Sequence, residues 1–405
     1  MITLADIHAA RARIRGIIYE SPCAYSETTS QLTGARVFFK LDNLQMTGSF
    51  KERGALNKLL SLTEDERQRG VIAASAGNHG LAVAFHAHRL GIPAAIVMPR
   101  FAPLVKVSSA RRYGAEVILA GADFDEALAE ALRLQRERGS VFIPAFNDPA
   151  VIAGQGTLGL ELLEQTPDFA AVIAPVGGGG LIGGVALALK ESGFLGRVIG
   201  VQAERIASMQ AALAAGAPTS LPPATTIADG IAVRRVGDLT LPLVQQYVDE
   251  IVTVSEAELA HAILVLLENE KTVVEGAAAT TLAALLSRPL HLAGQAVVLI
   301  LSGGNIDVNV IARVIEKGLV QEGRLTRLSL IVTDRPGALA RVSTLVADQG
   351  ANIQEIVHTR GFSRAEIGES EITLTLETLG PQHIAEVIAA LRAAGYQVFQ
   401  ERPGP

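Results

Sequence analysis

Turns rich in glycine join apolar strands to helices at four places in this chain, and they constrain its fold most strongly. Short apolar strands alternate with helices between residues 71 and 143, and again at larger spacing between residues 172 and 301. This alternation is typical of parallel sheets that helices cover on both faces. We therefore expect an α/β fold with two doubly wound parallel-sheet lobes, in which a smaller lobe, about residues 50–143, is inserted into the larger one.

The pattern changes near Gly323. Beyond it, strands are expected at residues 328–332, 353–357, 371–376 and 398–399, and helices at residues 337–349 and 383–394. This β-α-β-β-α-β order is that of a ferredoxin-like domain. The sequence thus predicts one large domain over residues 1–322 and a second domain over residues 323–405.

Composition limits the classes of protein and partner. The chain has 405 residues, of which 49% are hydrophobic, which is enough for two or three well-packed domains. The net charge of −6 and the lack of basic runs argue against a nucleic-acid partner. A single cysteine, Cys23, excludes an internal disulfide and a cysteine-based metal site, and fits the reducing cytoplasm. The uncharged stretch 170–189 contains Pro175 and four glycines, so we expect a strand, a turn and a helix there and no membrane span.

Residues 48–55, Gly-Ser-Phe-Lys-Glu-Arg-Gly-Ala, hold the first candidate catalytic group. Ser49 and Glu52 have the spacing of a capping box and predict that a helix begins here. Lys51 would then lie in the first helical turn, where the helix dipole disfavours an ammonium. An amine whose pKa is lowered in this way can form a Schiff base with a carbonyl compound. For a lysine considered alone, an ordinary solvated side chain is the alternative.

Two further turns are suited to bind anions through their backbone N–H groups. The first is Ser-Ala-Gly-Asn-His-Gly, residues 75–80, which could bind the carboxylate of a substrate. The alternative is a plain turn in which Gly77 has a positive φ. The glycines 177–180 before Leu181 let the backbone close around a phosphate, and a merely flexible turn is the alternative. This run is neither the dinucleotide fingerprint nor a P-loop.

Ser302 begins the fourth turn, Ser-Gly-Gly-Asn, directly after the last buried strand of the larger lobe. In open parallel sheets, ligands bind at the carboxyl ends of the strands. Lys51, Asn78, the tetraglycine run and Ser302 can therefore converge on one cleft. An amine for a Schiff base, a phosphate site and a polar partner for a heterocycle together describe a site for pyridoxal 5'-phosphate.

These motifs, with Gly-Gln-Gly-Thr at residues 154–157, stand in an order that resembles the fold-type II pyridoxal-phosphate enzymes, the class of the tryptophan synthase β subunit. Residues 4–316 are more narrowly similar to the threonine/serine dehydratase family, the threonine ammonia-lyases. This resemblance implies that Lys51 forms the Schiff base and then takes the Cα proton of the substrate. L-Threonine would lose water and ammonia to give 2-oxobutanoate, and L-serine would give pyruvate.

The resemblance also implies the remaining site residues. Cofactor contacts are implied for Phe50, Lys51, Asn78, Gly177, Gly178, Gly179, Gly180, Leu181, Glu275 and Ser302. Substrate contacts are implied for Ser75, Ala76, Gly77, Asn78 and His79. A buried structural carboxylate paired elsewhere is the alternative role for Glu275, and no metal ligands are assigned. Because a hydroxyl cannot stabilise a protonated pyridine as a carboxylate would, Ser302 favours prompt loss of the β-group over transamination.

Residues 328–405 resemble an ACT domain, an amino-acid-sensing module, through Asp-Arg-Pro-Gly-Ala-Leu at 334–339 and Gly-Ala-Asn-Ile at 350–353. The implied effector-binding residues are Asp334, Gly337, Asn352 and Ile353. Isoleucine or valine is the expected effector, since 2-oxobutanoate is a precursor of isoleucine. A structural or dimerising domain is the alternative. The family also implies a homo-oligomer, either a dimer or a tetramer.

Three other functions stay open on the sequence. Serine racemase shares most of these motifs, but racemisation needs a second base on the opposite face of Cα, where this chain has Ala76 in place of a serine. A 3-hydroxyaspartate dehydratase would need a cation for the distal carboxylate, and the sequence does not place one. A non-catalytic amino-acid sensor would have no use for Lys51.

Overall fold

The structure is a computed structural model that describes residues 2–102, 104–166 and 168–401. Its contacts divide the chain into two compact units, Met1–Asp307 and Val308–Pro405. The division falls before helix α14 (Val308–Gln321), whereas the boundary expected from the sequence, at residue 323, falls after it. Helix α14 was not among the predicted helices.

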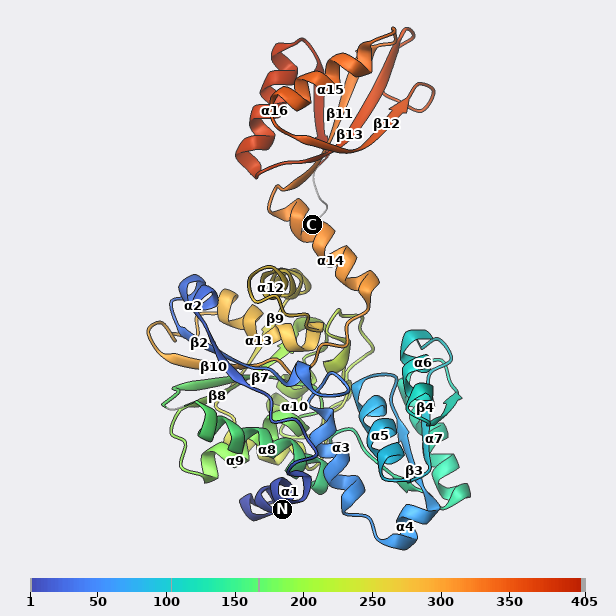
Figure 1. The fold of residues 1–405 in the computed structure, drawn as a ribbon, viewed down its shortest axis with the longest axis vertical. Coiled ribbons are helices and arrows are strands. Elements are labelled where there is room, and N and C mark those ends of the chain that lie inside the picture. The colour runs from blue at the N-terminus through green and yellow to red at the C-terminus, as the bar shows by residue number, and fades with distance from the viewer. Residues whose placement is uncertain (1, 103, 167, 402–405) are drawn as a thin grey trace. The chain divides into compact units, whose positions relative to one another are not determined.

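The small lobe of the first unit is built on a four-stranded parallel sheet (Figure 1). Its elements are α3 (Lys51–Leu60), α4 (Glu64–Arg69), β3 (Val71–Ala74), α5 (Asn78–Arg89), β4 (Ala94–Met98), α6 (Leu104–Arg112), β5 (Glu116–Leu119), α7 (Phe124–Arg138) and β6 (Val141–Phe142). The strand order is β5-β4-β3-β6. Val71 and Ala73 of β3 pack with α3 and α5, whereas Ile72 and Ala74 pack with α7. Helices therefore cover both faces of the sheet, as the sequence predicted.

The large lobe contains a six-stranded sheet of order β1-β2-β10-β7-β8-β9, in which only β1 runs antiparallel to its neighbour. Its strands are β1 (Cys23–Ser26), β2 (Arg36–Lys40), β7 (Ala171–Pro175), β8 (Arg197–Ala203), β9 (Glu250–Val254) and β10 (Ala296–Ile300). Its helices are α1 (Leu4–Ile14), α2 (Glu27–Thr33), α8 (Pro149–Gln165), α9 (Gly180–Glu191), α10 (Ser208–Ala215), α11 (Thr240–Tyr247), α12 (Glu256–Asn269) and α13 (Gly276–Ser287). The strands of this sheet come from both sides of the small lobe in the chain.

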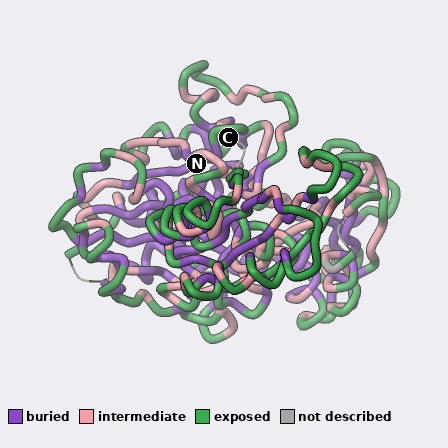
Figure 2. Tube along the Cα trace, turned by 90° about the horizontal axis from the view of Figure 1, so that it is seen from above, coloured by how far each residue is buried: buried purple, intermediate pink, exposed green. Residues whose placement is uncertain are grey.

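The core of the large lobe explains the uncharged stretch 170–189. This stretch forms β7, the tetraglycine turn and α9, as predicted. Val172 and Ala174 of β7 pack with α8 and α9 in one buried cluster, and α13 packs against β7 as well. Figure 2 shows the buried segments in purple inside the molecule and the exposed segments in green around them. In the part of the chain that the structure describes, no helix is long and apolar enough to cross a membrane.

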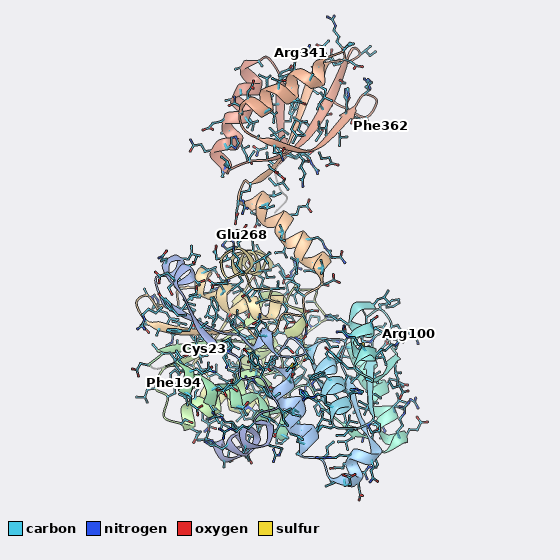
Figure 3. All side chains as sticks on the ribbon, in the orientation of Figure 1. Cys23, Arg100, Phe194, Glu268, Arg341 and Phe362 are labelled. Carbon is cyan, nitrogen blue, oxygen red and sulfur yellow. The ribbon has the colours of Figure 1, made fainter. Side chains whose placement is uncertain are left out.

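The second unit continues after α14 with the β-α-β-β-α-β order that the sequence predicted. Its elements are β11 (Leu325–Thr333), α15 (Ala338–Asp348), β12 (Asn352–Thr359), β13 (Glu369–Glu377), α16 (Pro381–Ala393) and β14 (Gln397–Glu401). The four strands form an antiparallel sheet of order β12-β13-β11-β14, and both helices pack on one buried cluster with it. Phe362, in the loop between β12 and β13, is fully exposed (Figure 3).

Candidate active site

Lys51 is the first residue of α3, as its motif predicts, but the predicted capping box is wrong. Among the residues that the structure describes, no side chain caps this helix. The Glu52 carboxylate instead accepts a hydrogen bond from the Thr47 N–H and contacts His86. The buried Ser49 Oγ has no hydrogen-bond partner among the described residues. Partners distant in the sequence thus replace the local pairing that this spacing favours.

The amine of Lys51 lies in an environment that disfavours its charge. Its Nζ donates a hydrogen bond to the Ala145 carbonyl oxygen at 2.9 Å and lies 5.0 Å from the centre of the Phe50 ring. Burial lowers the pKa of Lys51 to about 8, although the negative charge of Glu275 opposes this shift. Desolvation is therefore the main cause of the lowered pKa of Lys51, whereas the sequence had suggested the helix dipole. A neutral, nucleophilic amine is accessible near neutral pH.

Asn78, the first residue of α5, connects two polar side chains. Its Nδ2 donates to Glu275 Oε1 and Oε2 at 2.8 and 2.9 Å, and its Oδ1 accepts a hydrogen bond from Asn305 Nδ2 at 2.9 Å. Glu275 is buried, and burial raises the pKa of its carboxyl to about 7. Glu275 therefore contacts one expected site residue, Asn78, and interacts electrostatically with another, Lys51.

The turn after β10 lies against the segment that precedes α3. Ser49 and Gly303 form an antiparallel bridge, and the Phe50 N–H donates to the Ser302 carbonyl oxygen at 2.9 Å. A Cβ on Gly303 would lie 2.5 Å from Glu275 Oε1, so a larger residue there would displace the Glu275 carboxylate. The Ser302 hydroxyl is buried and has no hydrogen-bond partner among the described residues. Because an unpaired buried hydroxyl is costly, this one marks a place for a polar ligand atom.

The tetraglycine run connects β7 to α9. Gly179 takes the N-cap position with a φ of 93°, in the left-handed region that favours glycine. A Cβ on Gly178 would lie 2.4 Å from the Phe146 ring. Thr240 Oγ1 donates to the Gly178 carbonyl oxygen at 2.6 Å and fixes the turn from the other side. No side chain in the described part of the chain caps α9, so the first N–H groups of this helix can hold a phosphate.

The turn at residues 75–79 joins β3 to α5. Ser75 Oγ accepts a hydrogen bond from the Gly77 N–H at 3.2 Å, and no described side chain caps α5. The N–H groups at the start of α5 are therefore available to a carboxylate. His79 is buried with its Nε2 at 2.8 Å from the Ile143 carbonyl oxygen, and burial lowers its pKa to about 3. Its imidazole is thus neutral at physiological pH.

Direct contacts link these segments, which are far apart in the sequence. Ala145, whose carbonyl accepts from Lys51, precedes Phe146, which packs against Gly178. Ala145, Phe146 and Asn305 were not among the expected site residues. Asn305 is the last residue of the Ser-Gly-Gly-Asn motif, so the motif itself held a signal for it. Ala145 and Phe146 follow a short strand in a loop without a motif, and only the tertiary structure reveals them.

The expected effector residues lie at two opposite ends of the sheet in the second unit. Asn352 pairs with Glu377, which pairs with Leu325, the first residue of β11. Asp334 follows Thr333, the last residue of β11. The nine residues of β11 make eight steps of about 3.3 Å, which separate the two ends by roughly 26 Å. One small ligand therefore cannot contact both Asp334 and Asn352 within a single chain.

Each end of this sheet has its own polar groups. Asp334 accepts two hydrogen bonds from Arg360, at 2.7 and 3.0 Å, and Gly337 is the N-cap of α15 with a φ of 87°. Arg341, labelled in Figure 3, lies within the first turn of α15. At the other end, Asn352 Nδ2 donates to Glu377 Oε2 at 3.0 Å and lines a hollow of about 900 Å³ that α14 also lines. Ile353, next to Asn352, packs against the core of the domain.

Comparisons with known proteins match both units. Residues 14–303 match the family described as pyridoxal-phosphate dependent enzyme, and residues 326–395 match the ACT domain. The chain is 50% identical to the L-threonine ammonia-lyase of Thermotoga maritima over 98% of its own length and 99% of that protein. It is 43% identical to the catabolic L-threonine dehydratase of Escherichia coli over 77% of its own length and 96% of that protein. The solved structure of maize serine racemase matches with a TM-score of 0.74 and 36% identity. The match covers 80% of this chain and 99% of the maize protein.

Proposed function

The chain belongs to the pyridoxal-phosphate dependent enzymes and carries a C-terminal ACT domain, and we propose that it deaminates L-threonine to 2-oxobutanoate and ammonia. The observation that carries this proposal is the buried Lys51 amine, which donates a hydrogen bond to the Ala145 carbonyl oxygen and whose pKa burial lowers to about 8. The Thermotoga maritima and Escherichia coli relatives are named for a reaction of threonine. L-Serine, which also carries a β-hydroxyl, is the second substrate that we expect, with pyruvate as the product.

The residues of the site fit pyridoxal 5'-phosphate. The N–H groups of Gly180 and Leu181, at the start of α9, would hold the phosphate, together with the glycines before them. The Ser302 hydroxyl, which has no partner among the residues described, would bind the pyridine nitrogen. Phe50 would lie against the ring, and Asn78 would contact its phenolic oxygen. The bound cofactor supplies an electron sink for the negative charge that develops at Cα of the substrate.

Side chains of this protein perform the proton transfer and orient the substrate. Near pH 8 the Lys51 amine is neutral in a large fraction of molecules, so it can take the Cα proton as a general base. The N–H groups at the start of α5 hold the substrate carboxylate, and the neutral His79 adds no competing charge there. Because the Ser302 hydroxyl cannot stabilise a protonated pyridine as a carboxylate would, the negative charge that develops on the substrate stays near Cα. This favours loss of the β-hydroxyl over transamination.

An assay of 2-oxo-acid formation with L-threonine, L-serine and 3-hydroxyaspartate tests the proposed reaction. We expect the highest kcat/KM for L-threonine, together with a visible absorption band from cofactor bound to Lys51. Turnover of 3-hydroxyaspartate alone would replace the proposal with that dehydratase. Threonine binding without a visible band and without turnover would identify an amino-acid sensor.

Serine racemisation is a second candidate function, because maize serine racemase shares the fold. Racemisation needs a base opposite Lys51, and Ala76, which packs against the core of the small lobe, accepts no proton. The wild-type protein should therefore produce keto acid with little D-serine, and Ala76→Ser should raise the yield of D-serine. Chiral chromatography of the products measures both. Substantial D-serine from the wild type would contradict the assigned role of Ala76.

We propose that the ACT domain binds isoleucine or valine and that two copies of the chain share each effector. Asp334 and Gly337 of one copy would lie beside Asn352 and Ile353 of another, since the two ends of one sheet are too far apart for one ligand. This requirement supports the expected homo-oligomer. An effector bound at Asn352 would also contact α14, the helix that leads from the first unit into the ACT domain. A change in α14 is thus a route from effector binding to the active site.

The cytoplasm is our proposal for the location of the protein. Cys23, labelled in Figure 3, is the single cysteine of the sequence, so the chain cannot form an internal disulfide. Its Sγ accepts a hydrogen bond from the Thr166 hydroxyl at 2.9 Å, and burial raises the pKa of its thiol. A protonated, partly buried thiol suits a reducing compartment.

A further inference from the structure

A buried pair, Glu52 and His86, lies next to Lys51 in the fold and has no role in the proposed reaction. The fully buried Glu52 carboxylate lies 3.0 Å from Nε2 of His86, which is 1% exposed. Glu52 follows Lys51 in α3, and His86 lies about two turns after Asn78 in α5. The pair therefore joins the two helices whose first residues are Lys51 and Asn78.

The second oxygen of Glu52 connects this pair, through hydrogen bonds of Thr47 and Asn305, back to helix α5. We call this closed set of contacts the ring. Glu52 Oε1 accepts from the Thr47 N–H, and the Thr47 carbonyl oxygen accepts from Asn305 Nδ2 at 2.7 Å. The same Asn305 nitrogen donates to Asn78 Oδ1 at 2.9 Å. Because Asn78 and His86 belong to one helix, the ring returns to its starting point.

The ring constrains groups that must be oriented for the reaction. Asn305 fixes the amide of Asn78 so that its Nδ2 points at the Glu275 carboxylate. Thr47 precedes the segment 48–50, which pairs with Ser302 and Gly303. Opening the ring at Glu52 would leave the buried Thr47 N–H without an acceptor and release both constraints.

We propose that Glu52 and His86 are positioning residues, which orient Asn78 and the segment 48–50 through Thr47 and Asn305. This proposal rests on the proposed lyase activity, because it assigns roles at the same site. Neither side chain needs to touch the substrate or the cofactor. What matters is the reach of the residue-52 side chain, which must meet the Thr47 N–H and the His86 ring together.

Two conservative substitutions separate positioning from a need for buried negative charge. Glu52→Gln keeps the length of the side chain; its amide oxygen can accept from Thr47, and its amide nitrogen can donate to His86 once the imidazole takes its other tautomer. Glu52→Asp keeps the charge but is one methylene shorter and cannot reach both partners. Positioning thus predicts that Gln is tolerated and Asp is not, whereas a requirement for charge predicts the opposite order.

The experiment measures kcat, KM, the visible absorption band and the dissociation constant of pyridoxal phosphate for both variants. We expect Glu52→Gln to stay within about threefold of the wild type, and Glu52→Asp to lose on the order of 10- to 100-fold in kcat with little change in KM. The visible band should shift only in Glu52→Asp. Equal activity of both variants, or loss in Glu52→Gln alone, would overturn the proposal.

Lys40 provides a matched control for general loss of stability. Its fully buried ammonium contacts Glu161, Gln165 and the Ser21 carbonyl, none of which belongs to the ring. Lys40→Met should lower the melting temperature but leave kcat and the visible band unchanged. A loss of kcat in Lys40→Met that matches Glu52→Asp at equal stability would refute a specific role for the ring.

A double variant keeps the test decisive if Glu52→Asp does not fold. Replacing both Glu52 and His86 with leucine leaves no buried charge or imidazole without a partner, and such paired replacements are often tolerated. The ring would be open in this variant, so we expect the same fall in kcat and shift of the band. An unchanged band and cofactor affinity would overturn the proposal. A wild-type protein without lyase activity would contradict the proposed function, while the band and the cofactor affinity would still report on positioning.

Discussion

The two candidate binding regions of this chain differ most in how far their polar groups are withdrawn from water. In the first unit, Ser302 is 1% exposed and Glu275 is 4% exposed, and burial brings the pKa values of Lys51 and Glu275 towards neutrality. In the ACT domain, Asp334 and Asn352 are exposed. Asp334 keeps a lowered pKa because Arg360 donates hydrogen bonds to it.

This difference is the one expected between a site proposed to perform chemistry and a site proposed to bind an effector reversibly. Desolvation changes protonation equilibria and so provides an amine that can exchange protons near neutral pH. Exposed groups keep their ordinary charges and bind a zwitterionic effector with modest energy unless another surface covers them. We therefore expect large effects from substitutions in the buried region and smaller effects from those in the exposed region.

Lys51→Ala should have the largest effect. Without the amine, the protein has neither a covalent attachment for the cofactor nor a base for Cα, so kcat should fall at least about 1000-fold and the visible band should vanish. The 2-oxo-acid assay and an absorption spectrum measure both. Lys58→Ala, about two turns further along the same helix, removes an ion pair with Asp148 and should keep both properties. An active Lys51→Ala variant with the band intact would exclude the assigned role.

Glu275→Gln tests whether burial really raises the pKa of this carboxyl. Glu275 has a folded pKa of about 7 against an ordinary value of 4.5, so between these values the folded state binds more protons than the unfolded state. The free energy of unfolding of the cofactor-free protein should therefore fall as the pH rises from 4.5 to 7, by about 3 kcal/mol from this residue.

Urea unfolding at pH 5, 6 and 7 measures this contribution. The amide of Glu275→Gln does not titrate, so the variant should become more stable relative to the wild type as the pH rises. If the two stability curves run parallel over this range, Glu275 titrates at its ordinary pKa and the buried site is more hydrated than the structure indicates.

Deletion of residues 308–405 tests the contribution of the exposed region. The cut follows the boundary between the compact units and removes α14 together with the ACT domain. The shortened protein should deaminate threonine and lose its response to isoleucine or valine, a coupling typically worth 5- to 150-fold in affinity. Full effector sensitivity after the deletion would place the regulatory site in the first unit. A folded but inactive product would show that the ACT domain is structural.

Mixing two variants gives the smallest expected effect and the sharpest test of a shared effector site. Asp334→Ala and Asn352→Ala should each weaken the effector response while leaving the effector-free rate nearly unchanged. Oligomers that contain both variants would have some sites with neither substitution, so part of the response should return. Effector titrations of the mixture, refolded together, measure this recovery. No recovery, with mixed oligomers present, would indicate that Asp334 and Asn352 do not share one effector site.

The sequence by itself predicted most of the elements, though not α14, and the residue types of the candidate site. Apolar strands of four or five residues with glycine-rich turns behind them predicted both parallel sheets, because that periodicity is compatible with few other packings. The same local patterns placed Lys51 at a helix start and the tetraglycine run at another. Both positions hold in the structure, since they depend on backbone geometry within a few residues.

Only the tertiary structure decided which partners these residues have. Ser49 and Glu52 match a capping box in sequence, yet Glu52 bonds Thr47 and His86, because a fully buried carboxylate must find donors wherever the packed chain supplies them. Desolvation of Lys51 likewise depends on what is packed around it. The separation of Asp334 from Asn352 follows from the direction of β11 and β12 in the sheet, which no local pattern records. Burial and long-range pairing are properties of the folded chain, and the pKa shifts of Lys51 and Glu275 arise from them.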